Sequence, residues 1–382
     1  MTTQFGTFDD WPAFAAGQAR HDKLTAPALA PAAVRRLIGM PEAIGAPGDA
    51  RVERVWERDG ILGEEISWSV GYGPRTTAWL LRPSAARGPL PGVLALHSHD
   101  DVKAFGKEKI ADGPDELSAT HLAAVRRTYG DRAFANALAL QGFTVLVPDV
   151  FLWGSRRFER EAIESALASA SQFAWLKPFL GEDQRRARQQ GLSDEERYER
   201  MAVLHEDVIE RECRVLGTSL AGVVAYEDSL ALHYLRSRAD VCQGDIGVIG
   251  CSGGGARAAL LGATSPDIAL VAVICMMSSY REMVEQHVAS HTWLLFPPGL
   301  APAYDWPDLV LTRAPGPLLV QYARSDELFP LSGMMAAHEA IAARYGSLGR
   351  PEAYVGQFFE GGHRFDRPMQ EAAFAQLASF LR

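Results

Sequence analysis

The feature that most constrains the fold is a series of short apolar runs, separated by segments long enough to form helices. The runs are rich in Leu and in β-branched Val and Ile. Near-continuous apolar runs of this length are typical of strands covered by helices on both faces, as in a parallel sheet. They lie at residues 92–97, 143–149, 246–252, 269–277, 317–323 and 352–359. We therefore predict an α/β protein with a mostly parallel central sheet flanked by helices.

Three further segments do not belong to this series. Residues 1–48 mix Ala and Pro with short helical runs, which indicates an N-terminal arm packed on the core. Residues 51–82 hold three β-prone runs separated by turn residues, which predicts an antiparallel start to the sheet. Residues 155–212 are charge-rich and longer than one crossover helix needs, so we expect a helical insertion that acts as a cap or lid. A solvated helical hairpin without a role in the site is the alternative. The core is then expected over 49–154 and 213–382.

Charge and composition exclude several kinds of partner. The 38 Lys and Arg residues are outnumbered by 47 Asp and Glu residues, and a net charge of −9 disfavours binding to nucleic acid or anionic lipid. The N-terminus shows no signal-peptide pattern, and no stretch approaches the length of an apolar membrane span. The four cysteines form no C-x-x-C pair. We expect a cytoplasmic protein that binds neither nucleic acid nor membrane, with a homodimer as a candidate assembly.

The chemistry-bearing motif is G-x-S-x-G at residues 250–254. It follows an apolar run and precedes a helical pattern, which is the strand–turn–helix context of a nucleophile elbow. Side chains two positions before and after the nucleophile would crowd this strained turn, so glycine is needed at both places. Ser252 is therefore the candidate nucleophile. If Cys251 were the nucleophile, Ile249 would occupy one of the crowded positions. A phosphate-binding turn is disfavoured because the G-x-G-x-x-G spacing is missing.

An acid and a histidine follow in the chain order that this kind of site requires. Asp326 comes directly after an apolar run and before a Pro-marked loop, and His363 lies in a Gly-Gly turn after the last run. We predict that His363 takes the Ser252 proton and that Asp326 orients the imidazole. Glu327 is the alternative acid.

Two backbone N–H groups are the candidate oxyanion hole. One is that of Gly253, directly after the nucleophile, and the other is that of His99 in the loop HSHDD after the run 92–97. The same loop offers an alternative interpretation, a metal site of His97, His99 and Asp101, because alternate residues of an extended chain share a face.

Together these motifs resemble the dienelactone hydrolase and acetyl xylan esterase-like branch of the α/β-hydrolases over most of residues 90–370. The stretches that carry the resemblance are LALHSHDDVKAFGKEK, YGDRAFANALALQGFTVLVPDVFLWGSRR, LGTSLAGVVAYEDSLALHYLRSR, IGVIGCSGGG, ARSDELFP and GGH at His363. The resemblance implies an α/β-hydrolase fold and hydrolysis of a small carboxylic ester through an acyl-enzyme, without a metal or an organic cofactor. Ser252 stands where dienelactone hydrolases carry Cys, and Gly253 stands where glucuronoyl esterases carry Arg.

Aromatic and Met residues after the predicted strands are candidate walls of a substrate pocket, although such residues also form ordinary core. They are Phe151, Trp153, Met276, Met277, Tyr280, Trp293 and Phe296. Arg156 is a candidate clamp for a substrate carboxylate, with a surface position as the alternative. A serine esterase is the leading hypothesis for the function. A carbon–carbon bond hydrolase, lyase or acyltransferase using the same triad and a non-catalytic binding protein are the alternatives.

Overall fold

A single mixed sheet forms the centre of the computed structural model, which describes residues 7, 10–18, 29–41, 45–116, 120–170, 191–284 and 286–381. The order of the nine described strands across the sheet is β1-β2-β3-β5-β4-β6-β7-β8-β9. Their bounds are β1 Gly48–Arg58, β2 Ile61–Ser69, β3 Thr76–Pro83, β4 Leu90–Leu96, β5 Thr144–Pro148, β6 Val241–Cys251, β7 Leu270–Ile274, β8 Leu318–Ala323 and β9 Tyr354–Phe359.

Strand direction divides the sheet into two parts. The pairs β1–β2, β2–β3 and β3–β5 are antiparallel, and the pairs from β5 through β4, β6, β7 and β8 to β9 are parallel. The antiparallel start and the parallel remainder that the sequence predicts are therefore both confirmed. Because the parallel strands share one direction, the loops after β4, β6, β8 and β9 leave the same edge of the sheet, where ligand sites of such sheets usually lie.

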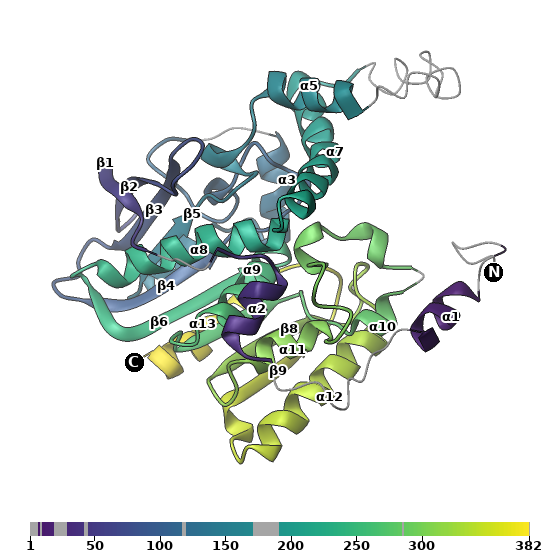
Figure 1. Cartoon of the computed structure of the whole chain (residues 1–382). Coiled ribbons are helices and arrows are strands. Elements are labelled where there is room, and N and C mark those ends of the chain that lie inside the picture. Colours follow the sequence, from purple (N-terminus) through teal and green to yellow (C-terminus); the bar gives the residue numbers. More distant parts are fainter. Residues whose placement is uncertain are drawn as a thin grey trace.

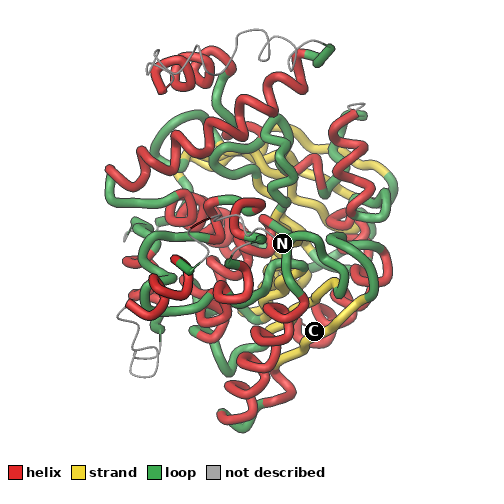
Figure 2. The backbone as a smooth tube through the Cα atoms, turned by 90° about the vertical axis from the view of Figure 1, so that its right-hand side faces the viewer, coloured by secondary structure: helices red, strands yellow, loops and turns green. Residues whose placement is uncertain are grey.

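Helices cover both faces of the sheet, and Figure 2 shows the strands enclosed between them. The described α-helices are α1 Trp11–Gln18, α2 Pro31–Leu37, α3 Thr120–Thr128, α4 Phe134–Leu140, α5 Arg160–Ala170, α7 Asp194–Val215, α8 Leu220–Ser237, α9 Gly253–Thr264, α10 Tyr280–Met283, α11 Trp306–Leu311, α12 Leu331–Ser347 and α13 Arg367–Leu381. Short 3₁₀ turns lie at Lys107–Lys109, Gly154–Arg156, Val288–Ser290, Trp293–Leu295 and Pro351–Ala353.

Alternate residues of the central strands belong to two separate cores. Leu94 and Leu96 of β4 pack in the core formed with α8, α9 and α12, whereas Val93 and Ala95 pack in the core formed with α4 and α13. Successive side chains of a strand point to opposite faces, so a strand buried on both faces must be apolar at every position. This requirement explains the unbroken apolar runs from which the fold was predicted.

Two strand ends differ from the predicted runs. β6 begins at Val241, before the apolar run, because Val241 pairs with Leu90 ahead of a register shift. β7 ends at Ile274 although the apolar run continues, because Cys275 adopts a φ of 48° that an extended strand cannot hold. The core therefore stays apolar beyond the last hydrogen-bonded residue of β7.

Residues 29–41 of the arm before the sheet pack on the main body. Val34 of α2 is fully buried, and Arg35 donates to the carbonyl oxygen of Thr264 at the end of α9. The hydroxyl of Ser219 donates to the carbonyl oxygen of Ile38 over 2.6 Å. These contacts hold residues 29–41 against α8 and α9.

Helices α5 and α7 form the described part of the expected insertion at 155–212, and Figure 1 shows them at one end of the molecule, beyond the sheet. Tyr198 of α7 donates to the carbonyl oxygen of Phe158 before α5. Residues 171–190 of the expected insertion lie outside the described residues. The boundary expected at 212 falls inside α7, which begins with a capping box at Ser193 and continues to Val215.

Among the described helices, none is by itself long and apolar enough to cross a membrane; α7 and α8 meet the length and composition criterion only together, as a pair bent by 89°.

Candidate active site

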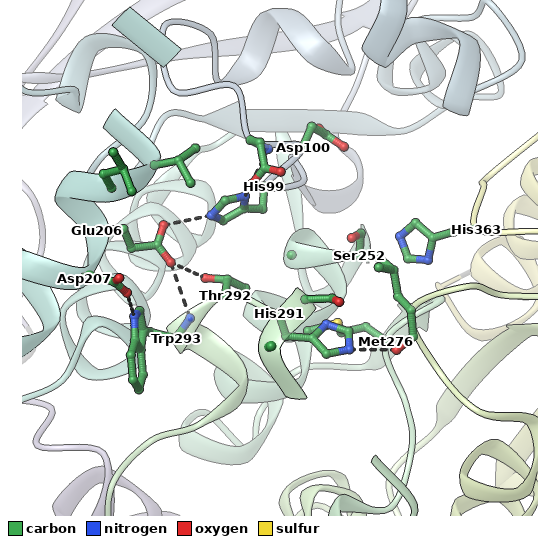
Figure 3. Close-up of a pocket in the computed structure, with 17 residues that line it drawn as sticks. His99, Asp100, Glu206, Asp207, Ser252, Met276, His291, Thr292, Trp293 and His363 are labelled. Atoms are coloured by element: carbon green, nitrogen blue, oxygen red, sulfur yellow. Dashed lines mark hydrogen bonds and ion pairs between the residues drawn. The ribbon is translucent and has the colours of Figure 1, made fainter. Parts of the chain in front are cut away.

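Ser252 lies in the sharp turn between β6 and α9, with φ 55° and ψ −125°. Non-glycine residues rarely adopt this region because it is strained. A Cβ atom on Gly250 would come within 2.2 Å of the carbonyl oxygen of Gly254, and a Cβ atom on Gly254 within 2.1 Å of that of Leu96. The close packing thus requires glycine at both positions, for the steric reason inferred from the motif. The Ser252 side chain lines a cavity of about 530 Å³ (Figure 3).

The histidine and the acid come from the loops after two neighbouring parallel strands, β9 and β8. Nδ1 of His363 lies 2.7 Å from Oδ2 of Asp326. The carboxylate only accepts, so Nδ1 carries the proton. The backbone N–H of Leu328 donates to the other oxygen of Asp326 over 2.9 Å, which fixes the carboxylate. Glu327, the alternative acid, accepts from the backbone N–H of His363 and not from its ring.

The other ring nitrogen of His363 is available for chemistry. Nε2 is buried and has no hydrogen-bond partner among the described residues. His363 and Ser252 line the same cavity, and Figure 3 shows the ring next to the serine side chain. Burial disfavours the imidazolium, but the hydrogen bond and the charge of Asp326 outweigh burial and raise the pKa of His363 to about 9. In its neutral form the ring offers Nε2 as a proton acceptor toward the cavity.

The backbone nitrogen of His99 lies next to the first residue of α9, because a Cβ atom on Gly253 would come within 2.7 Å of it. Gly253 opens the helix, so no helical carbonyl precedes it to accept its N–H. The two predicted oxyanion donors are therefore adjacent to each other and to Ser252. The helix N-terminus also favours negative charge at this point.

Lys109 anchors the loop that presents His99. Its buried ammonium donates to the carbonyl oxygens of Ser98 and His99, at 2.9 and 2.8 Å. In a trans peptide the C=O and the N–H point to opposite sides. The bond to the Ser98 carbonyl therefore sets the direction of the His99 N–H, which belongs to the same peptide unit.

Glu206 of α7 is a residue of the site that the sequence did not reveal. Its carboxylate accepts from Nε2 of His99 over 2.8 Å and from the hydroxyl of Thr292 over 2.7 Å, and it forms a buried ion pair with Lys103. Burial opposes its ionisation, but Lys103 and His99 hold the pKa of Glu206 well below its usual range. A Glu on a charge-rich amphipathic helix has the pattern of a solvated face, so only the tertiary packing distinguishes it.

The overall fold is shared with known structures. No protein-family model matches the sequence. A Bacillus subtilis (strain 168) protein named "Putative hydrolase YtaP" is 23% identical over 302 residues, which span 79% of this chain and 82% of that protein. The glucuronoyl esterase from Solibacter usitatus superposes with a TM-score of 0.62 at 13% identity, covering 92% of each chain. Acetyl xylan esterase 1 from Thermoanaerobacterium sp. JW/SL YS485 gives a TM-score of 0.55 at 15% identity, covering 94% of this chain and 96% of that one. The chain has the α/β-hydrolase fold.

Within this α/β-hydrolase fold, Arg156 occupies neither of the two positions considered for it. It is buried outside the cavity lining, and its guanidinium lies 2.6 Å from Oε1 of Glu227 on α8. It also donates to the carbonyl oxygens of Tyr72 and Pro74. Arg156 is thus a structural residue, because its enclosed guanidinium forms an ion pair with the buried carboxylate of Glu227 on α8.

Five of the seven candidate wall residues also lie outside the lining of this cavity: Phe151, Trp153, Met277, Tyr280 and Phe296. Trp153 is buried behind the oxyanion loop, where its indole N–H donates to the carbonyl oxygen of His99 over 3.3 Å. Tyr280 donates its hydroxyl to the carbonyl oxygen of Leu295. Met276 does line the cavity, beside Ser252. Trp293, another of the candidate wall residues, also lines the cavity.

The alternative metal site in the oxyanion loop does not assemble. Nδ1 of His97 contacts the carbonyl oxygen of Ser98 at 3.0 Å, and Nε2 of His99 is bonded to Glu206. Within the described residues, the group with three ligand atoms close together is Cys275, Asp326 and His363. The alternative nucleophile Cys251 is fully buried in the core.

Proposed function

We propose that the protein hydrolyses a carboxylic ester through an acyl-enzyme on Ser252. The observation that carries the proposal is the convergence on one cavity of a serine at a strained elbow and a histidine whose Nδ1 is held by Asp326. The similarity to acetyl xylan and glucuronoyl esterases in fold supports ester hydrolysis as the reaction class. Nothing in this arrangement requires a metal or an organic cofactor for an acyl-transfer step.

The proposed reaction begins when Oγ of Ser252 attacks the ester carbonyl while Nε2 of His363 takes its proton. The carbonyl oxygen becomes an oxyanion that accepts from the N–H groups of Gly253 and His99. His363 then returns the proton to the leaving alcohol. Water, activated by the same nitrogen, attacks the acyl-enzyme and releases the acid. Hydrogen bonds between nucleophile and base often tighten only when the substrate is bound.

The helical insertion contributes to the proposed substrate site. Val203, Leu204, Glu206 and Asp207 of α7 line the cavity with Ser252. We therefore propose that α7 forms one wall of the pocket, as a cap would.

A fluorophosphonate probe and 4-nitrophenyl acetate test the proposal directly. The probe is expected to label Ser252, and the ester is expected to give a burst of nitrophenol followed by slower turnover. Ser252→Ala is expected to abolish labelling and to lower kcat by roughly 10⁴-fold or more. Ser347→Ala, the same change at an exposed serine at the end of α12, is the matched control and should leave both unchanged. Near-normal turnover by folded Ser252→Ala would refute the assignment. Labelling without turnover of any ester would refute ester hydrolysis.

A further inference from the structure

The cavity beside Ser252 is lined by carboxylates. Its described lining residues include Asp100, Asp101, Glu206 and Asp207, but no Lys or Arg. Figure 3 shows Asp100 next to His99, and Asp207 with Glu206 on the α7 side. A substrate group that enters this cavity therefore meets negative side chains, and the sign of its own charge matters for binding.

Cations behind the wall compensate two of these four carboxylates. Lys103 pairs with Glu206, and Nζ of Lys109 lies 3.6 Å from Oδ2 of Asp100. Both lysines are buried and already bonded to the protein. They neutralise the wall locally but present no free ammonium group to the cavity.

The other two carboxylates have no Lys or Arg ion-pair partner among the described residues. Oδ1 of Asp207 accepts from the indole N–H of Trp293 over 2.7 Å, which is a neutral donor. Oδ1 of Asp101 lies 3.2 Å from Nδ1 of His99, and the Asp101 side chain is 78% exposed. These two residues therefore leave an unbalanced negative charge at the cavity.

Among the histidines of the lining, His291 adds no positive charge to offset it, and protonated His363 is paired with Asp326. Nε2 of His291 lies 2.9 Å from the carbonyl oxygen of Leu328 and must donate to it. Burial lowers the pKa of His291 to about 4, so its ring is neutral and its Nδ1 is an acceptor.

We infer that the cavity selects ester substrates that carry a positively charged, hydrogen-bond-donating group, and that it disfavours esters carrying a carboxylate. This inference rests on the proposed ester hydrolysis at Ser252. A cationic group is attracted by Asp207 and Asp101 and can donate to their free carboxylate oxygens. An anionic group finds no described Lys or Arg on the wall, and the charge of protonated His363 is already balanced by Asp326. It is therefore repelled, so both the attraction of cations and the repulsion of anions contribute to the selection.

Matched aryl acetates test the inference. The series is 4-(aminomethyl)phenyl, 4-methylphenyl and 4-(carboxymethyl)phenyl acetate, which differ mainly in charge. Their kcat/KM values are divided by their rates of alkaline hydrolysis to remove leaving-group effects. The corrected values are expected to fall in the order cation, neutral, anion, with about tenfold between the ends at low salt. The spread should narrow as salt is added, because salt screens exposed charges. Equal corrected values, or the reverse order, would overturn the inference.

Asp207→Asn isolates the charge. Asparagine keeps an oxygen that accepts from the Trp293 indole, so the wall retains its shape. The cation-to-anion ratio is expected to drop about threefold, with the neutral ester little changed. Glu212→Gln is the matched control, because it removes the same charge from an exposed position of α7 that does not line the cavity. An unchanged ratio in Asp207→Asn, or an equal drop in Glu212→Gln, would overturn the inference.

Failure of the proposed ester hydrolysis can be distinguished from failure of the charge selection. If none of the three esters is turned over and Ser252 is not labelled, ester hydrolysis is refuted. Charge selection is then measured by calorimetric binding of the matching phenols, 4-(aminomethyl)phenol and 4-hydroxyphenylacetate. Tighter binding of the amine supports the selection of cations, and equal or weaker binding contradicts it.

Discussion

The ammonium group of Lys109 lies 2.9 Å from the carbonyl oxygen of Ser98. That oxygen and the N–H of His99 belong to one planar peptide unit, so a contact on one side of the loop orients a donor on the other. The loop after β4 is thus held by a buried charge, and the direction of the His99 N–H, whose nitrogen lies next to Gly253, is fixed before any substrate arrives.

Lys109→Met is expected to lower kcat by about 10- to 100-fold with a smaller change in KM, because the proposed oxyanion donor, the N–H of His99, would act mainly in the transition state. Steady-state kinetics with 4-nitrophenyl acetate measures the changes in kcat and KM separately. Circular dichroism and the urea midpoint report whether the fold persists. Equal loss in kcat and in the affinity for a substrate analogue would indicate a general structural role, and unchanged kcat would refute the orienting role.

The pH dependence should follow the protonation of His363. Its pKa is raised to about 9, and the protonated ring cannot take the Ser252 proton. We therefore expect kcat/KM to rise with pH and to level off above about 9. Asp326→Asn removes the charge that raises the pKa, while burial continues to lower it, so the acidic limb should move to lower pH as the maximal rate falls roughly 10³-fold or more. If the acidic limb of the pH profile stays at the same pH in this variant, Asp326 does not set the pKa of His363.

The raised pKa of His363 also makes the stability of the fold depend on pH. Whereas kcat/KM is expected to rise with pH, stability is expected to fall. On folding, the pKa of His363 rises from about 6.5 to about 9, so the folded state binds the proton more tightly. This contribution is complete below about pH 6.5 and is lost as the pH rises through about 9. The Tm of the wild type is therefore expected to exceed that of His363→Gln at pH 6, and the difference should shrink by pH 9.5. A difference independent of pH would contradict this linkage.

Arg156→Met is expected to lower the free energy of unfolding by about 3–5 kcal/mol, because it leaves Glu227 buried without its guanidinium. Urea denaturation measures the loss. The double variant Arg156→Met with Glu227→Gln should lose less, since no buried charge is left unpaired. Arg157→Met, at the exposed neighbouring position, is the control and should change stability by no more than about 0.5 kcal/mol. A small effect of Arg156→Met would show that Glu227 finds another partner or takes up a proton.

Gly250→Ala is expected to disrupt the elbow, because the added methyl would collide with the carbonyl oxygen of Gly254. Labelling of Ser252 by the fluorophosphonate probe should be lost or slowed by at least about 100-fold, the scale of effect that small misplacements of reacting groups produce. Gly346→Ala in α12, where a Cβ atom meets nothing within 4 Å, is the control and should stabilise the helix by up to about 1 kcal/mol. Normal labelling of Gly250→Ala would refute the steric argument.

Local chain chemistry was enough to predict the α/β fold and three candidate site residues, of which Ser252 and His363 line the cavity and Asp326 contacts the His363 ring. Strands buried on both faces must be apolar throughout, so their positions are visible in the order of residues. A serine between glycines at a strand end, and an acid and a histidine directly after later strands, are likewise local patterns. Parallel strands then place Ser252, Asp326 and His363 at one edge without further information.

Tertiary packing alone decided the surroundings of these residues. Glu206 and Asp207 lie on a charge-rich helix whose residue pattern is the same whether it faces solvent or a cavity. Arg156 forms a buried ion pair because Glu227, 71 residues later in the chain, lies beside it in space. Such contacts join residues far apart in the chain, and their energies depend on which charges meet and how far water is excluded. The candidate reacting groups could therefore be predicted from neighbouring residues, whereas the charge of the pocket follows from the packing of α7 against the sheet edge.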